Sequence, residues 1–105
     1  MLKSPRPVLV EFSKDPCPPC VSQKAELATL AEEFRGQVTF ATFLLVQGEF
    51  HVNCPKIRDR YQLHWMPTTI LIVNGKERMR WEELHKAAEI REGIKQVLLE
   101  TPSSP

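Results

Sequence analysis

The sequence lacks several features that would point to a particular class of protein. Its 105 residues carry 14 lysines and arginines against 13 aspartates and glutamates, so the net charge of +1 offers no basic surface for nucleic acid. No apolar run approaches the roughly 20 residues that a transmembrane helix needs. The opening stretch, MLKSPRPVLVEF, lacks the long apolar region and the cleavage site of a signal peptide. We therefore expect a cytoplasmic protein with no nucleic-acid partner and no membrane span.

Cysteine is also scarce. The chain has 3 cysteines, Cys17, Cys20 and Cys54, and a small odd number does not suit the disulfide framework of a secreted domain. A close pair plus one further cysteine is more typical of redox chemistry or metal binding. Repeats and low-complexity segments are missing too. We expect one domain over 1–105, with an ordered core at about 7–99 between a short N-terminal lead and a C-terminal tail.

Proline, in contrast, is frequent, and three of the 9 prolines fall in DPCPPC at 15–20. The first backbone N–H groups of a helix have no partner within the helix, and proline has no N–H to lose. Pro18 and Pro19 are therefore best placed in the first turn of a helix. Cys17 would then be the N-cap and Cys20 would lie in the first turn. The positive end of the helix dipole would favour the thiolate of Cys17, which is its reactive form.

The apolar patterns predict elements in the order β-α-β-α-β-β-α, which corresponds to an α/β fold with a four-stranded mixed sheet and helices on both faces. Seven segments carry this prediction: strands at 7–13, 38–46, 70–73 and 77–81, helices at 18–35 and 83–99, and a short helix within CPKIRDRYQL. The turn Asn74-Gly75 joins the last two strands into a hairpin. The first helix is predicted from apolar residues at three- and four-residue steps: Val21, Ala25, Leu27, Ala28, Leu30, Ala31 and Phe34.

These segments resemble the thioredoxin family. VLVEFSKDPCPPC is similar to its strand, active site and helix, and VNGK (73–76) is similar to its hairpin turn. WMPTT (65–69) resembles a second signature, in which a cis-proline lies opposite the disulfide. The resemblance covers about 7–99 and lacks the family's first strand and helix, so it implies a minimal thioredoxin-like fold.

The resemblance implies a thiol–disulfide oxidoreductase that reduces protein disulfides. Cys17 would attack the substrate disulfide and Cys20 would resolve the mixed disulfide, with no cofactor besides the redox-active Cys17–Cys20 disulfide. Pro18, Pro19 and the expected cis-proline Pro67 would shape this site. The implied partners are protein disulfide substrates and an unidentified reductase, and we expect a monomer.

Three residues beside Pro67 are the expected substrate contacts. In the family, the cis bond turns the backbone of the preceding residue, here Met66, toward the main chain of the substrate. Trp65 and Thr68 flank this dipeptide and would also contact substrate. For Trp65, a place in the core is an equally good interpretation.

Glu11 stands where the family has a buried aspartate. An unpaired carboxylate is costly to bury, so the pKa of Glu11 should be raised and its side chain could accept the proton of Cys20. The alternative is a side chain that faces solvent beside Lys14 or Arg80.

Other positions depart from the family's pattern. Ser13 and Pro16 replace aromatic residues before the cysteine pair, and Ala25 replaces a proline within the helix. A lysine of the next strand has no counterpart, and Thr42 is near its place. A glycine near the end of the last strand is also missing.

Two other functions fit the same residues. A domain of this fold could bind partners without turnover. His51 and Cys54 could also join Cys17 and Cys20 in a zinc site of three cysteines and one histidine. Against zinc, the two central prolines cannot supply the backbone N–H groups that commonly support cysteine-rich metal sites. We therefore expect no bound metal.

Overall fold

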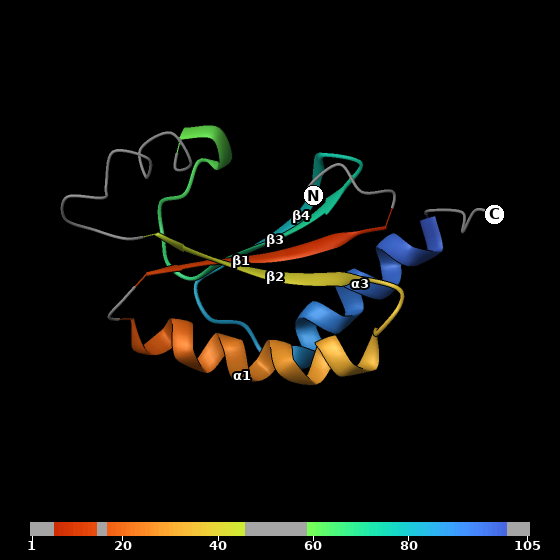
Figure 1. Cartoon of the computed structure of the whole chain (residues 1–105), viewed down its shortest axis with the longest axis horizontal. Helices are drawn as coiled ribbons and strands as arrows, with labels where there is room; N and C mark the ends of the chain where they lie inside the picture. Colours follow the sequence, from red (N-terminus) through yellow and green to blue (C-terminus); the bar gives the residue numbers. More distant parts are fainter. Residues whose placement is uncertain (1–5, 15–16, 46–58, 101–105) are drawn as a thin grey trace.

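The computed structural model describes residues 6–14, 17–45 and 59–100. Its four strands form one sheet in the order β2-β1-β3-β4 (Figure 1). The strands are β1 (Val8–Lys14), β2 (Thr39–Leu45), β3 (Thr68–Val73) and β4 (Lys76–Glu82). β1 is parallel to β2 and antiparallel to β3, and β3 is antiparallel to β4. The predicted mixed sheet is confirmed.

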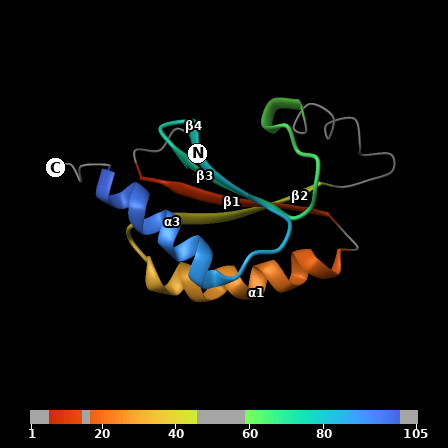
Figure 2. The ribbon, with the colours of Figure 1, turned by 180° about the vertical axis from the view of Figure 1, so that it is seen from behind.

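Helices cover both faces of the sheet, as predicted. α1 (Pro18–Glu33) and α3 (Ala87–Glu100) lie on one face, and the helical residues 59–61 lie on the other (Figures 1 and 2). The rest of the short helix predicted in CPKIRDRYQL falls outside the described residues. No helix in the described part of the chain is long and apolar enough to cross a membrane.

Two apolar clusters hold these layers together, because successive side chains of a strand point to opposite faces. One lies between the sheet and the two long helices, and its buried members are Leu9, Leu27, Leu30, Phe34, Val38, Leu71, Val73, Trp81, Ile90, Ile94 and Val97. The other lies on the opposite face, and its buried members are Val8, Val10, Phe12, Leu63, Ile70 and Ile72. With both faces covered, Val8 to Ser13 of β1 are all buried.

The turn between β3 and β4 follows from its sequence. Asn74 and Gly75 both have positive φ, 54° and 79°. This is the backbone of the two-residue hairpin turn that Asn-Gly favours, because neither residue meets a large steric penalty there. The predicted hairpin is confirmed.

The final helix begins later than predicted, at Ala87 rather than near Glu83. Glu83 has a φ of 67°, which no right-handed helix permits, and its N–H donates to the carbonyl of Pro67 at 2.7 Å. The N–H of Ala87 donates to Glu26 Oε1 of α1 at 2.7 Å, so a side chain of α1 caps α3. This tertiary cap leaves no mark near residue 87 in the sequence.

α1 buries only some of its apolar residues. Its buried residues are Cys20, Gln23, Leu27 and Leu30, whereas Val21, Ala25 and Ala28 are exposed. The helix packs along one row of residues at three- and four-residue steps, and the polar Gln23 belongs to that row.

The contact between α3 and β4 requires glycine at residue 93. A Cβ atom on Gly93 would lie 2.4 Å from Cζ2 of Trp81 and 2.8 Å from Sδ of Met79. We predict that Gly93→Ala lowers the free energy of unfolding by about 1–3 kcal/mol, measured by chemical denaturation. Helix propensity alone would make alanine more stable than glycine here by about 1 kcal/mol. A net loss of stability would therefore come from the steric clash. In a Trp81→Phe background the loss should shrink, because the smaller ring lacks the closest atom, and an equal loss in both backgrounds would refute this packing.

Candidate active site

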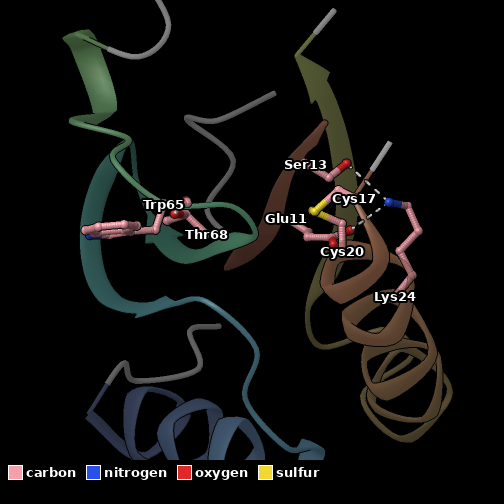
Figure 3. Close-up of a disulfide and its surroundings, with 7 residues drawn as sticks. All are labelled: Glu11, Ser13, Cys17, Cys20, Lys24, Trp65 and Thr68. Carbon is pink, nitrogen blue, oxygen red and sulfur yellow. Dashed lines mark hydrogen bonds and ion pairs between the residues drawn. A yellow bond between two sulfur atoms is a disulfide. The ribbon is translucent and has the colours of Figure 1, made fainter. Parts of the chain in front are cut away.

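The cysteine pair lies where β1 passes into α1. Cys17 is the N-cap, with an extended backbone (φ −161°), and Pro18 and Pro19 occupy the first positions of the helix. The Cys17 carbonyl accepts hydrogen bonds from the N–H groups of Cys20 at 3.0 Å and Val21 at 3.2 Å. The two cysteines form a disulfide with their Cα atoms 5.2 Å apart (Figure 3). The predicted positions at the N-cap and in the first turn are confirmed.

The two sulfur-bearing residues differ in accessibility. Cys17 is 6% exposed, whereas Cys20 is fully buried. Pro18 and Pro19 are exposed and border the pair on the helix side. Cys17 is therefore the cysteine of the pair that a substrate can approach, and the helix dipole acts on it directly.

The cis bond expected from the resemblance is present between Met66 and Pro67. Pro67 is buried and Met66 is half-buried. Their loop faces the cysteine pair across the end of the sheet (Figure 3). The geometry at Pro67 agrees with the expectation, and contact between Met66 and substrate stays a prediction.

Trp65 and Thr68 have different surroundings. Trp65 is 56% exposed, so it does not belong to the core, and its ring points away from the disulfide in Figure 3. Thr68 is buried, and its hydroxyl donates to the carbonyl of Trp65. Thr68 thus holds the backbone of the loop, and direct contact of either side chain with substrate stays a prediction.

Glu11 is fully buried in the middle of β1, and neither of its carboxylate oxygens has a hydrogen-bond partner. Burial raises the pKa of Glu11 above its ordinary value, and the positive charge of Lys24 opposes part of that rise. The alternative of a solvent-facing Glu11 is therefore wrong. Arg80 instead pairs with Glu77 at 2.9 Å.

Sequence reasoning missed Lys24, which lies one helical turn after Cys20. Its Nζ lies 3.4 Å from Oε1 of Glu11, too long for a good hydrogen bond, and donates to Oγ of Ser13 at 3.2 Å (Figure 3). Thr42, near the place of the family's strand lysine, is the partner of Glu11 across β1 and β2. α1 therefore supplies a cation that β2 lacks. The four-residue step from Cys20 was the one available signal.

Sequence reasoning also missed Gln23, a buried residue of α1 that holds this helix in place beside the site. Its side-chain amide donates to the carbonyl of His85 at 3.0 Å and accepts from the His85 N–H at 2.9 Å. A buried amide with both partners satisfied fixes the first turns of α1 against the segment before α3. Helical pattern alone cannot find such a residue, because a polar side chain on a helix normally predicts an exposed position.

The zinc hypothesis involves residues outside the described part of the chain, since His51 and Cys54 fall there. Within residues 6–14, 17–45 and 59–100, no three histidine, cysteine, aspartate or glutamate side chains come together as a metal site. The expectation that the protein binds no metal stays a prediction.

This chain belongs to the thioredoxin family: the family model described as Thioredoxin matches residues 1–96. A thioredoxin-like protein of Synechocystis sp. is 29% identical over 87 residues, which cover 83% of this chain and 77% of that protein. The structure of Fasciola hepatica thioredoxin is similar, with a TM-score of 0.70 and 26% identity over 90% of this chain and 83% of that one. A malaria parasite thioredoxin-2 has the same fold, with a TM-score of 0.73 and 16% identity over 87% of this chain and 82% of that one.

The burial of Glu11 predicts a pH-dependent stability. The pKa of Glu11 is raised in the folded protein above the ordinary value of 4.5, so its contribution to stability is complete below pH 4.5 and is lost as pH rises through the folded-state pKa. Glu11→Gln cannot lose a proton. We predict that its free energy of unfolding exceeds that of the wild type by on the order of 1–3 kcal/mol at neutral pH, with the difference shrinking toward pH 4.

Urea denaturation across this pH range would measure the difference. Glu92→Gln, which changes an exposed carboxylate of α3, should give a difference that hardly varies with pH. If the difference in free energy of unfolding between Glu11→Gln and the wild type does not change with pH, Glu11 is ionised at no cost in the folded protein.

Proposed function

We propose that this chain is a thiol–disulfide oxidoreductase that reduces protein disulfides with Cys17 as nucleophile and Cys20 as resolving thiol. The observation that carries the proposal is the placement of the pair. The partly accessible Cys17 caps a helix whose dipole favours its thiolate, and the buried Cys20 lies three residues behind it in the first turn.

The proposed reaction transfers two electrons from the protein to the substrate. The Cys17 thiolate attacks one sulfur of a substrate disulfide, forms a mixed disulfide and expels the other substrate sulfur as a thiolate, which takes a proton from solvent. Cys20 then loses its proton and attacks Sγ of Cys17. The Cys17–Cys20 disulfide forms, and the second substrate sulfur leaves as a thiolate. The substrate is reduced and the protein oxidised, and a dithiol reductant must restore the pair.

Glu11 is the proposed acceptor of the Cys20 proton. Figure 3 shows Glu11, Cys20 and the ammonium group of Lys24 near one another at the junction between β1 and α1. A carboxylate with a raised pKa is a better base for a thiol than an ordinary one, because proton transfer to it is less uphill. Burial raises the pKa of Glu11, and Lys24 opposes part of that rise because its positive charge favours the carboxylate.

The loop of Met66 and Pro67 is the proposed binding surface. With the cis bond in place, the backbone of Met66 is available to pair with an extended substrate segment beside the disulfide. This mode of recognition uses main-chain groups and is tolerant of sequence, which suits a reductase for several protein disulfides. Its electron donor would be a reductase, and the cytoplasm is its expected compartment.

We predict that the reduced protein will accelerate reduction of insulin with dithiothreitol as electron donor. Cys17→Ser should lower the rate to that of dithiothreitol alone, because the attacking thiolate is lost. Cys20→Ser should accumulate mixed disulfides with insulin, visible by non-reducing electrophoresis and mass spectrometry, because the resolving thiol is lost.

Cys54→Ala serves as the control, since the exchange needs only the pair, and its rate should match the wild type. Full activity in Cys17→Ser would rule out the mechanism. No acceleration by the wild type, with its Cys17 and Cys20 fully reduced, would favour the alternative of a binding domain without turnover.

A further inference from the structure

The two edge strands of the sheet differ sharply in charge. β4 (KERMRWE) carries Lys76, Glu77, Arg78, Arg80 and Glu82, whereas β2 (TFATFLL) carries no charged residue and no proline. Charges and prolines on edge strands normally prevent pairing with another chain. β4 has this protection and β2 does not. Among the described residues, only β1 pairs with β2, and none of them pairs with its outer edge.

The open edge of β2 presents a regular set of backbone groups. The N–H of Thr39 donates to the carbonyl of Pro7 at 2.9 Å, so Thr39 faces β1. Because backbone direction alternates along a strand, Phe40, Thr42 and Leu44 direct their N–H and C=O groups away from β1. Three consecutive pairing positions thus point outward.

Large apolar side chains at this edge are partly exposed, on either side of the polar Thr42. Phe43 is 40% exposed and Leu44 is 49% exposed. A pocket of about 250 Å³ beside β2 is lined by the charged Glu11 and Lys24, by Thr42, and by apolar residues of the two elements: Leu27, Ala28, Ala31, Phe40 and Ala41. Ala28 is exposed and adds to this surface. Exposed apolar side chains therefore extend from the outer edge of β2 to the adjoining side of α1, next to Lys24.

The sequence of β2 is complementary to itself. When two copies run antiparallel with Thr42 opposite Thr42, the outward residues pair with one another, Phe40 with Leu44 and Thr42 with Thr42, and each pair can exchange two hydrogen bonds. On the other face, the small Ala41 lies opposite the large Phe43. A register that pairs a residue whose backbone groups point away from β1 with one whose backbone groups point toward β1 is excluded. The N–H and C=O groups of the second residue already form hydrogen bonds with β1.

From this complementarity we propose that β2 is a homodimer interface, in which two copies of the chain join antiparallel at Thr42 into one continuous eight-stranded sheet. A second copy of the chain is the partner because β2 is uncharged and, when it pairs with another β2, places small side chains opposite large ones. The net charge of +1 adds little repulsion between copies. This proposal revises the expectation of a monomer and does not depend on the proposed redox activity.

The dimer would also cover the pocket beside the buried acid. Glu11 and Lys24 line the same pocket as Phe40 and Thr42, and the seam between the two copies runs along its β2 side. Each subunit would therefore close the β2 side of the other's pocket, which Glu11 lines from the central strand β1.

Sedimentation velocity of the full chain over a range of concentrations tests the interface. We expect a monomer–dimer equilibrium in the wild type. Leu44→Lys should weaken it at least about tenfold, because it places a charge on the open edge. Leu99→Lys is the matched control, since Leu99 is 86% exposed on α3 and outside the seam. Its equilibrium should match the wild type.

Hydrogen exchange supplies a second measurement, because dimer formation must slow exchange at the amides of Phe40, Thr42 and Leu44 as concentration rises. Slower exchange at these amides, together with weaker dimer formation in Leu44→Lys, would support the proposed interface. A wild type that stays monomeric at every concentration would overturn the proposal. A dimer that Leu44→Lys leaves intact, or one with no added protection in β2, would overturn it as well.

Discussion

The junction between β1 and α1 is the constraint on which the rest of the structure depends. A buried strand must turn into a helix within a few residues, and the prolines at positions 18 and 19 make this turn with no loss of backbone donors. The turn places Cys17 at the positive end of α1 and Cys20 beneath it. The buried strand β1 holds one side of the junction. On the other side, two hydrogen bonds between the side chain of Gln23 and the backbone of His85 join α1 to the segment before α3.

Charge is buried directly under this junction. Glu11 has no hydrogen-bond partner for its carboxylate and has Lys24 3.4 Å away. A buried carboxylate with no hydrogen-bond partner reduces stability, and the position of Glu11 beside the cysteine pair favours a chemical role for it. The position of Lys24 on the helix, one turn after Cys20, links the charge state of Glu11 to the element that carries both cysteines. Acid, cation and dithiol therefore form one unit.

The sequence predicted the sheet, the hairpin and the cysteine pair because each rests on local signals: apolar runs, Asn-Gly, and prolines around two thiols. It did not predict where α3 begins, since Glu26 caps that helix from α1, nor the partners of Gln23. These contacts join residues about 60 positions apart in the chain. Apolar periodicity predicted this helix but not which of its apolar residues are buried, because it marks more helix surface than one sheet can cover; Val21, Ala25 and Ala28 are exposed.

The active-site residues divide in the same way between those with a local signal in the sequence and those without one. The cysteines followed from spacing and Pro67 from resemblance, whereas Lys24 became visible only when α1 was folded onto β1. A lysine on a helix carries no sign of its partner in the sequence, and the expected place for a cation was the strand that holds Thr42.

The central claim is that Cys17 and Cys20 cycle between dithiol and disulfide, and a joint count of thiols and zinc tests it most directly. The protein would be purified without chelator, reduced, desalted and exposed to mild oxidant, with thiols counted by alkylation and mass spectrometry and zinc by elemental analysis. The account predicts no stoichiometric zinc, loss of the Cys17 and Cys20 thiols as one intramolecular disulfide, and a free thiol at Cys54. Stoichiometric zinc that is lost in both Cys54→Ala and His51→Ala would contradict it, because a bound metal would block the cycle.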